Sequence, residues 1–184
     1  MSLPRRPLLS LLALLALGLL VAGVSACGYE SDSKNVAEGE SVELGELKYI
    51  ATFSRYLNPN DTEDAAYLVG QEEPPKGESY FGVFFEVQNE TEETKPLPDK
   101  FTIEDSDHQV FESLASESLY AFPMGGEVEE HEQIPVLDST PEQGPIEGSV
   151  VLFLLPEEAS ENRPLTLHIP GPEGEEEAEV ELDL

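Results

Sequence analysis

The chain has 184 residues, of which 39 are acidic and 9 are basic, and it contains one cysteine and no tryptophan. This length fits one domain with short terminal segments. The formal net charge of -30 repels phosphates, so we expect no nucleic-acid partner. A single cysteine excludes an internal disulfide and a thiolate zinc finger.

The first 26 residues have the organisation of a cleaved export signal. Arg5 and Arg6 precede an almost wholly apolar run over residues 8–24. This run is near the lower limit of about 17 residues for a membrane-spanning helix, and it ends in small residues instead of a cationic stop. Removal of the segment takes away two arginines and no acid, so the mature net charge becomes -30 - 2 = -32.

The end of this segment reads Val24-Ser25-Ala26-Cys27-Gly28. It resembles the lipobox of bacterial lipoproteins. The resemblance implies cleavage before Cys27, a diacylglycerol on the Cys27 sulfur, and anchoring to the cell membrane on the extracytoplasmic side. Two or more acyl chains hold a domain that has no apolar membrane face of its own. The alternative is an ordinary secretory signal, cut after Ala26, with Cys27 unmodified.

Residues 27–43 are predicted to form an acidic, flexible tether, because the residues after Cys27 are small and polar with no apolar period. The predicted folded domain covers residues 44–184.

Apolar residues recur at every second position from Val42 onward, which indicates β-strands. A strand over residues 80–88 is predicted to be central, because its second face is also partly apolar. The inner faces of the first two long strands are predicted to carry Leu47, Tyr49, Ala51 and Phe53, and then Phe81, Val83, Phe85 and Val87.

The pattern continues to the C-terminus. A strand at residues 101–103 leads into the acidic turn Asp105-Ser106-Asp107, and residues 150–155 form a buried strand closed by Pro156. Residues 165–169 and 180–184 are predicted to form a hairpin across the turn at 171–177. Helices are limited to a turn or two at residues 112–120 and 157–162.

Seven or eight short strands separated by loops with glycine or proline predict an all-β antiparallel sandwich. Three segments, Tyr80–Asn89, Phe101–Asp107 and Gly148–Pro156, resemble the immunoglobulin-like domain of unknown function found on secreted bacterial lipoproteins. The resemblance covers Leu44–Ile169 and implies an immunoglobulin-like sandwich outside the membrane with no catalytic residues. His108 stands where the family commonly has glycine.

The residues do not predict an enzyme. No G-x-S-x-G motif occurs, and His108, His131 and His168 are predicted to be exposed on a turn, a loop and a polar strand face. A hydrolase that uses a pair of carboxylates remains an alternative in so acidic a chain.

Two acidic clusters are candidate calcium sites, because hard cations bind carboxylate and carbonyl oxygens of loops. One contains Asp61, Glu63 and Asp64, and the other contains Asp105 and Asp107. Neither matches the D-x-[DN]-x-[DN]-G loop. The alternative is turn chemistry, in which aspartate side chains accept backbone hydrogen bonds. No other cofactor is expected.

Aromatic and methionine side chains in loops favour contact surfaces. Tyr120, Phe122 and Met124 are therefore a candidate contact patch, and residues 67–70 are a second one. The alternative is that these side chains cap the core. The predicted protein is a membrane-anchored, non-enzymatic module with an unidentified envelope or secreted protein as partner. A calcium-dependent envelope protein is the alternative.

Overall fold

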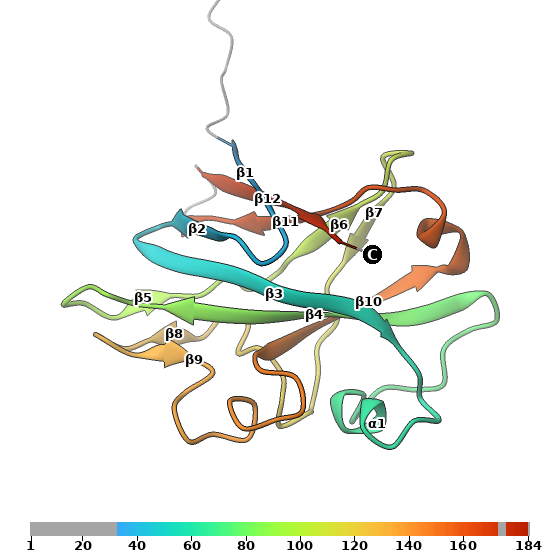
Figure 1. Ribbon diagram of the computed structural model, residues 1–184, viewed down its shortest axis with the longest axis horizontal. Helices are drawn as coiled ribbons and strands as arrows, with labels where there is room; N and C mark the ends of the chain where they lie inside the picture. The colour runs from blue at the N-terminus through green and yellow to red at the C-terminus, as the bar shows by residue number, and fades with distance from the viewer. Residues whose placement is uncertain (1–32, 173–175, 184) are drawn as a thin grey trace, which may run out of the picture. The chain divides into compact units, whose positions relative to one another are not determined.

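The computed structural model describes residues 33–172 and 176–183. Within these residues, two sheets form a β-sandwich (Figure 1). Sheet A has the strand order β1 (Ser33–Ala37), β12 (Glu177–Leu182), β11 (Leu165–Pro170), β6 (Thr102–Glu104) and β7 (Val110–Glu112). Sheet B has the order β10 (Ser149–Pro156), β4 (Glu78–Gln88), β3 (Leu47–Leu57) and β2 (Ser41–Leu44). The all-β sandwich predicted from the sequence is confirmed.

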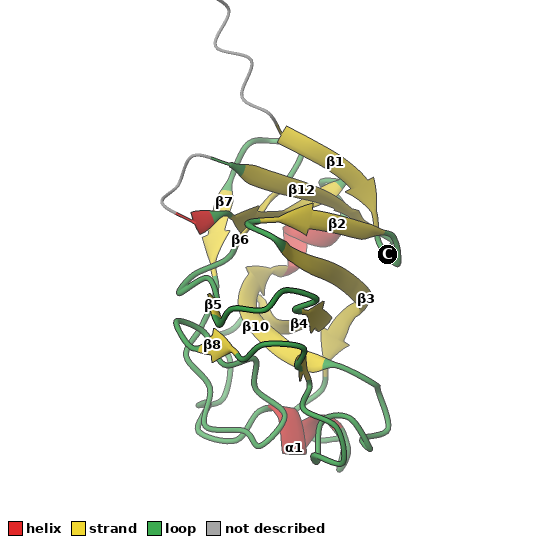
Figure 2. Cartoon of the chain, turned by 90° about the vertical axis from the view of Figure 1, so that its left-hand side faces the viewer, coloured by secondary structure: helices red, strands yellow, loops and turns green. Residues whose placement is uncertain are grey.

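Three short strands complete the described part. The strand β9 (Gln133–Ile134) pairs with the end of β4, and β5 (Lys95–Pro96) pairs with β8 (Glu127–Val128). Helical structure is limited to α1 (Asp64–Tyr67) and the 3₁₀ turn η1 (Glu157–Ser160). Figure 2 shows α1 among loops at one end of the sandwich.

The strand order is that of an immunoglobulin-like sandwich. The chain crosses from sheet B to sheet A after β4 and again after β10. The strands β3, β4 and β10 therefore take the places of A, B and E, and β6, β11 and β12 take those of C, F and G. All pairs in the two sheets are antiparallel except β1 with β12. The parallel pair adds β1 to the free edge of β12.

The core lies between the two sheets, because alternate residues of each strand point inward. Phe81, Val83, Phe85 and Val87 of β4 are fully buried there, as predicted. The final hairpin contributes its own inward residues, which are Leu165, Leu167, Ile169, Ala178, Val180 and Leu182.

A second apolar cluster covers the outer face of β4 and β10. Phe84 and Leu152 are buried there beneath Tyr67 of α1. The Tyr67 ring packs edge-on against Phe84, with 5.1 Å between the ring centroids. Because β4 is buried on both faces and pairs with both β3 and β10, its prediction as a central strand is confirmed.

The prediction for Phe53 was wrong. The register between β3 and β4 shifts between Ala51 and Phe53, which is a β-bulge. The extra residue reverses the alternation. Leu47, Tyr49 and Ala51 point inward as expected, but Phe53 is 43% exposed and Ser54 is buried in its place.

The predicted tether differs from the structure from Ser33 onward. Residues 33–37 form β1 on sheet A, and residues 41–44 form β2 on sheet B. Glu38 lies between β1 and β2, and its side chain links the two sheets. It accepts hydrogen bonds from the backbone N–H of Ser54 in β3 at 3.2 Å and of Asp183, which follows β12, at 3.3 Å. Residues 27–32 lie outside the described part.

The two predicted helical turns have different outcomes. Residues 157–160 form η1 as expected, whereas residues 112–120 contain no helix. Instead Leu114 and Ala121 form isolated bridges to β10. The helix α1 was not predicted, because four residues are too few for an apolar period.

Candidate functional site

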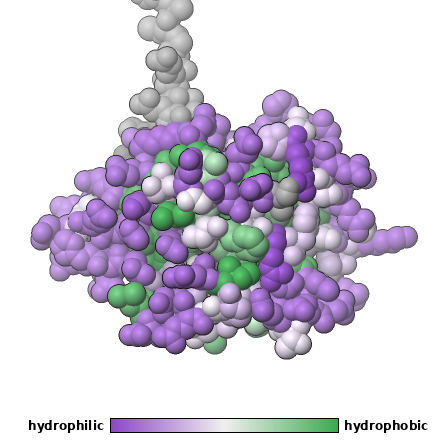
Figure 3. Space-filling view, in the orientation of Figure 1, coloured by the Kyte–Doolittle hydropathy of each residue, from purple (hydrophilic) through white to green (hydrophobic). Residues whose placement is uncertain are grey.

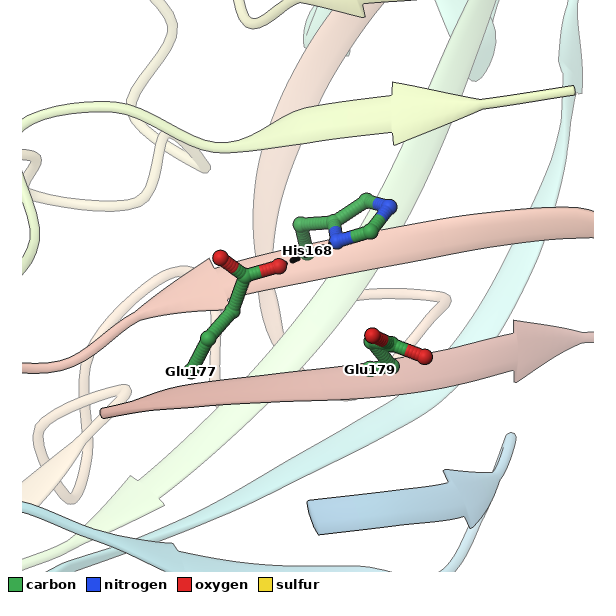
Figure 4. Close-up of side chains that lie close together, drawn as sticks. All are labelled: His168, Glu177 and Glu179. Carbon is green, nitrogen blue, oxygen red and sulfur yellow. Dashed lines mark hydrogen bonds and ion pairs between the residues drawn. The ribbon is translucent and has the colours of Figure 1, made fainter. Parts of the chain in front are cut away.

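The outer face of the β11–β12 hairpin gathers three side chains that can ligate a metal. Because Leu167, Ile169 and Ala178 of this hairpin point into the core, His168 and Glu179 between them point outward. His168 pairs directly with Glu179 across the ladder, and Glu177 pairs with Pro170 one step nearer the turn. Figure 4 shows the three side chains projecting from the two strands.

The ligand atoms of this cluster lie close together. One nitrogen of His168 and one carboxylate oxygen each of Glu177 and Glu179 all lie within 4.8 Å of one another. The Nδ1 atom of His168 is hydrogen-bonded to the Glu177 carboxylate. The His168 side chain is 19% exposed and that of Glu177 is 47% exposed, so solutes can reach the cluster.

The neighbouring strand β6 contributes Glu104 to this face. Its carboxylate lies 3.7 Å from Nε2 of His168 and also contacts Nδ1 of His108. The hydrogen bond that the His108 imidazole makes to the Glu104 carboxylate, and the negative charge of Glu104, raise the pKa of the exposed imidazole. His108 has a positive φ of 62°, a conformation that favours glycine and that histidine adopts more readily than most other residues.

The sequence predicted His168 on a polar strand face without a metal site, and Glu177 and Glu179 were not predicted as its partners. The predicted second strand began at Val180 and left Glu177 in the turn, whereas β12 begins at Glu177. Residues on the same face of two paired strands lie about 5 Å apart when directly opposite. The alternation around His168 was therefore the available signal, and its partners depend on where the second strand begins and on its register.

The first predicted calcium cluster does not leave its carboxylates free. Asp64 is buried, and its two oxygens bind the Arg55 guanidinium. It also accepts a hydrogen bond from the Asn58 backbone N–H at 2.7 Å. Asp61 accepts from the N–H groups of Glu63 and Asp64 at 2.9 and 3.2 Å. These contacts fit the alternative of turn chemistry.

The second predicted calcium cluster is also a hydrogen-bonded turn. Asp105 is buried, and one of its oxygens accepts from the backbone N–H groups of Asp107 and Gln109, both at 2.9 Å. The other oxygen lies 3.3 Å from the side-chain amide of Asn162. The Asp107 side chain is exposed. Asp105 therefore holds the β6–β7 turn and links it to the segment after η1.

The predicted contact patch divides into core and surface. The prediction for Phe122 was wrong, because its ring is buried between Phe85 and Phe101. Tyr120 is half-buried and packs on Tyr67 with 5.0 Å between the ring centroids. Met124 is half-buried against the same core as Phe122. In the second patch Tyr67 is buried, which leaves Val69 as its exposed apolar residue.

The predicted lipidation site, Cys27, lies outside the described residues. Within residues 33–172 and 176–183, no helix is long and apolar enough to cross a membrane.

Comparison with known proteins supports the fold. No family model and no curated protein matches the chain. The structure of the yjhA protein from Bacillus subtilis has a TM-score of 0.53 and 15% identity, over 80% of this chain and 99% of that chain. An uncharacterized β-sandwich protein from Clostridium difficile 630 has a TM-score of 0.50 and 13% identity, over 84% of this chain and 97% of that chain. These likenesses establish a shared β-sandwich fold.

Proposed function

We propose that the chain is a lipid-anchored, non-enzymatic binding module on the extracytoplasmic side of the cell membrane. The anchor rests on the segment Val24–Gly28, which has the residue types of a lipobox. The strand β1 begins at Ser33, six positions after Cys27. Six residues span at most about 20 Å, so a lipid on Cys27 would hold the sandwich close to the membrane by its β1 end.

The observation that carries the binding role is the exposure of four apolar side chains in loops. They are Val69 at 48%, Leu119 at 79%, Val136 at 51% and Leu137 at 61% exposure. The segments that bear Val69 and Leu119 are joined by hydrogen bonds, from Ser118 Oγ to the Ala66 carbonyl at 2.7 Å and from Gln71 Nε2 to the Ala115 carbonyl at 2.8 Å. We call these four residues the loop-end group.

The segments that bear Val69 and Leu119 lie at α1, because Val69 follows this helix and Ser118 is hydrogen-bonded to Ala66. Figure 1 shows β1 at the top of the view and α1 with its neighbouring loops at the bottom. Figure 3 shows apolar patches in both the upper and the lower part of this face, among polar side chains. A membrane anchor at the β1 end would therefore leave these loops accessible to a protein partner. Apolar residues within a polar rim are the usual anatomy of a protein-binding surface.

The non-enzymatic part of the proposal rests on the use of the buried acids. Asp64 is neutralised by Arg55, and Asp105 accepts two backbone hydrogen bonds. Neither carboxylate is free to transfer protons in a glycosidase-like pair. We expect no turnover of glycan substrates above a heat-killed control, and reproducible turnover would overturn this part.

The anchor is tested by mass spectrometry of the N-terminal tryptic peptide after expression of the full chain in a bacterial host. We expect an acylated Cys27 at the mature N-terminus and membrane-bound protein. The Cys27→Ser variant should lack the acyl groups and be released or left uncut. A wild-type chain that is secreted with a free thiol would refute the anchor.

The binding surface is tested by photo-crosslinking in intact cells. A photoreactive residue at position 119 or 137 should crosslink to one defined protein, and Leu119→Asp should reduce crosslinking from position 137. The matched control is a photoreactive residue at Val110, which is 57% exposed on β7 away from the loop-end group. Equal crosslinking of the same protein from position 110 would count against the loop-end group as the binding surface.

A further inference from the structure

The acids on the outer face of the final hairpin lack the basic partners that some other acids have. Asp64 is paired with Arg55, and Glu46 with Lys95. Within residues 33–172 and 176–183, neither Glu177 nor Glu179 forms an ion pair with a lysine or arginine, and the partner of Glu177 is the imidazole of His168. This face therefore combines an imidazole with carboxylates that no lysine or arginine balances.

The His168 ring, as a metal ligand, lies between two carboxylates. Glu177 is hydrogen-bonded to Nδ1, while Glu104 lies 3.7 Å from Nε2, too far for a hydrogen bond. When Glu177 turns from Nδ1 to an incoming ion, Glu104 becomes the only one of the two carboxylates beside a ring nitrogen. A carboxylate on one nitrogen favours the proton on that nitrogen and leaves the other nitrogen free to bind a metal. The backbone ladder fixes the strand positions, because His168 is directly opposite Glu179.

We propose that this face binds one transition-metal ion of the zinc class, ligated by Nδ1 of His168 and by the carboxylates of Glu177 and Glu179. Glu104 acts as a positioning residue that holds the imidazole from the Nε2 side. Nδ1 and both carboxylates must be deprotonated to bind the ion, and any proton they carry is released to solvent. The three protein ligands leave a fourth position open for water or for a donor atom from a partner.

The distances are compatible with this site after small side-chain movements. Each Zn–N or Zn–O bond is about 2.1 Å long, so two ligands of one ion lie at most about 4.2 Å apart. The present separations are within 4.8 Å. The exposed Glu177 side chain, which now contacts Nδ1, can rotate to admit the ion between them, whereas the less exposed His168 ring stays in place.

The ligand types decide between metal classes. Imidazole nitrogen favours zinc, copper and nickel, whereas calcium and magnesium prefer sets of six or more oxygens. The site therefore differs from the calcium loops predicted from the sequence in both residues and metal. It also goes beyond the proposed binding role, because it does not depend on the lipid or on the loop-end group.

The test measures Zn²⁺ binding to the full chain in detergent after treatment with a chelator. Binding is measured in physiological salt with an excess of magnesium, so that loose association with the acidic surface is suppressed. We expect one equivalent of zinc per chain and a melting temperature that rises with zinc concentration. Zinc that magnesium displaces in proportion to its concentration would show adventitious ion binding only and would overturn the proposal.

Variants locate the site. His168→Ala should abolish the tight equivalent, and Glu179→Gln should weaken it. Glu104→Gln should weaken it by about 10- to 100-fold, as for other carboxylates that orient a metal-bound histidine. The matched control is His131→Ala, because His131 is also an exposed histidine near a carboxylate, with Nε2 3.7 Å from Glu92.

The control should retain the full equivalent of zinc. Cobalt absorption provides a second measurement, since the visible bands of bound Co²⁺ should change in His168→Ala and not in His131→Ala. Unchanged zinc stoichiometry and affinity in His168→Ala would refute the site. Thermal unfolding of each metal-free variant shows whether it is folded. If His168→Ala does not fold, the zinc affinity of Glu179→Gln decides whether the site exists.

Discussion

At the scale of single residues, the pair of Arg55 and Asp64 is the strongest charged contact on sheet B. The Asp64 side chain is 4% exposed and that of Arg55 is 29% exposed. Removal of Arg55 would leave a buried carboxylate with one hydrogen-bond donor, the backbone N–H of Asn58. Arg55→Met should therefore lower the free energy of unfolding by about 2–3 kcal/mol, below the range for fully buried pairs because Arg55 is partly exposed.

Chemical denaturation of Arg55→Met and of a control measures this cost. Lys100→Met is the control, because Lys100 and Glu112 are paired at 2.7 Å with both side chains more than half exposed. The control should lose at most about 1 kcal/mol. Equal losses in the two variants would show that burial of Asp64 does not matter.

Glu86 gives a prediction about pH. Burial on the outer face of sheet B, and secondly the Glu147 carboxylate, raise the pKa of Glu86 above its ordinary value. A raised pKa in the folded state means that stability is lost as the pH rises from the ordinary value through the folded value. Glu86→Gln removes this loss, so it should be more stable than the wild type at neutral pH and equally stable below about pH 4.

Thermal unfolding across this pH range checks the prediction. Glu73→Gln serves as the control, because Glu73 is an exposed loop residue, and its stability should stay within about 0.5 kcal/mol of the wild type. A constant difference between Glu86→Gln and the wild type at every pH would assign the effect to packing instead of charge.

At the scale of elements, the long strands could be predicted because their apolar residues alternate over many positions. The bulge in β3 could not, since one extra residue leaves no local signal and changes the faces of Phe53 and Ser54. The strand β1 was missed for a different reason. Its residues Ser33 to Ala37 contain a single large apolar side chain, Val36, and the strand depends on its pairing with β12.

The candidate metal site shows the same limit. A hairpin was predicted from residues 165–169 and 180–184, and the structure forms it from residues 165–170 and 177–182. The predicted alternation placed His168 outward. The register that sets His168 opposite Glu179 depends on the geometry of the intervening turn, which composition does not determine. The loop aspartates, by contrast, suggested a cation from their sequence alone, yet Arg55 and backbone N–H groups bind Asp64 and Asp105.

A matched pair of substitutions tests whether β1 belongs to the domain. Val36 is half-buried and packs against the core, whereas its neighbour Ala37 is exposed. Val36→Ser should lower the free energy of unfolding by about 1 kcal/mol through lost apolar burial. Ala37→Ser should change it by less than about 0.5 kcal/mol. Equal stability of both variants in chemical denaturation would mean that residues 33–37 act as a tether.

At the scale of the whole molecule, the charge of -30 has opposite effects on solubility and stability. Outward glutamates on β12, at positions 177, 179 and 181, keep the outer face of sheet A polar and so favour solubility. The same excess of negative charge destabilises the folded state by self-repulsion. Monovalent salt screens this repulsion over about 10 Å at 0.1 M, so the folded chain should be less stable at low ionic strength.

The expected result is a melting temperature that rises with sodium chloride, by about 2–4 °C for each kcal/mol of relieved repulsion. Sodium and magnesium chloride at equal ionic strength separate screening from specific binding, because screening alone depends chiefly on ionic strength. A further rise that appears only with zinc and disappears in His168→Ala would then belong to the hairpin site. A melting temperature that falls with sodium chloride would show that attractive ion pairs, such as those of Arg55 and Lys95, outweigh the repulsion between the acids.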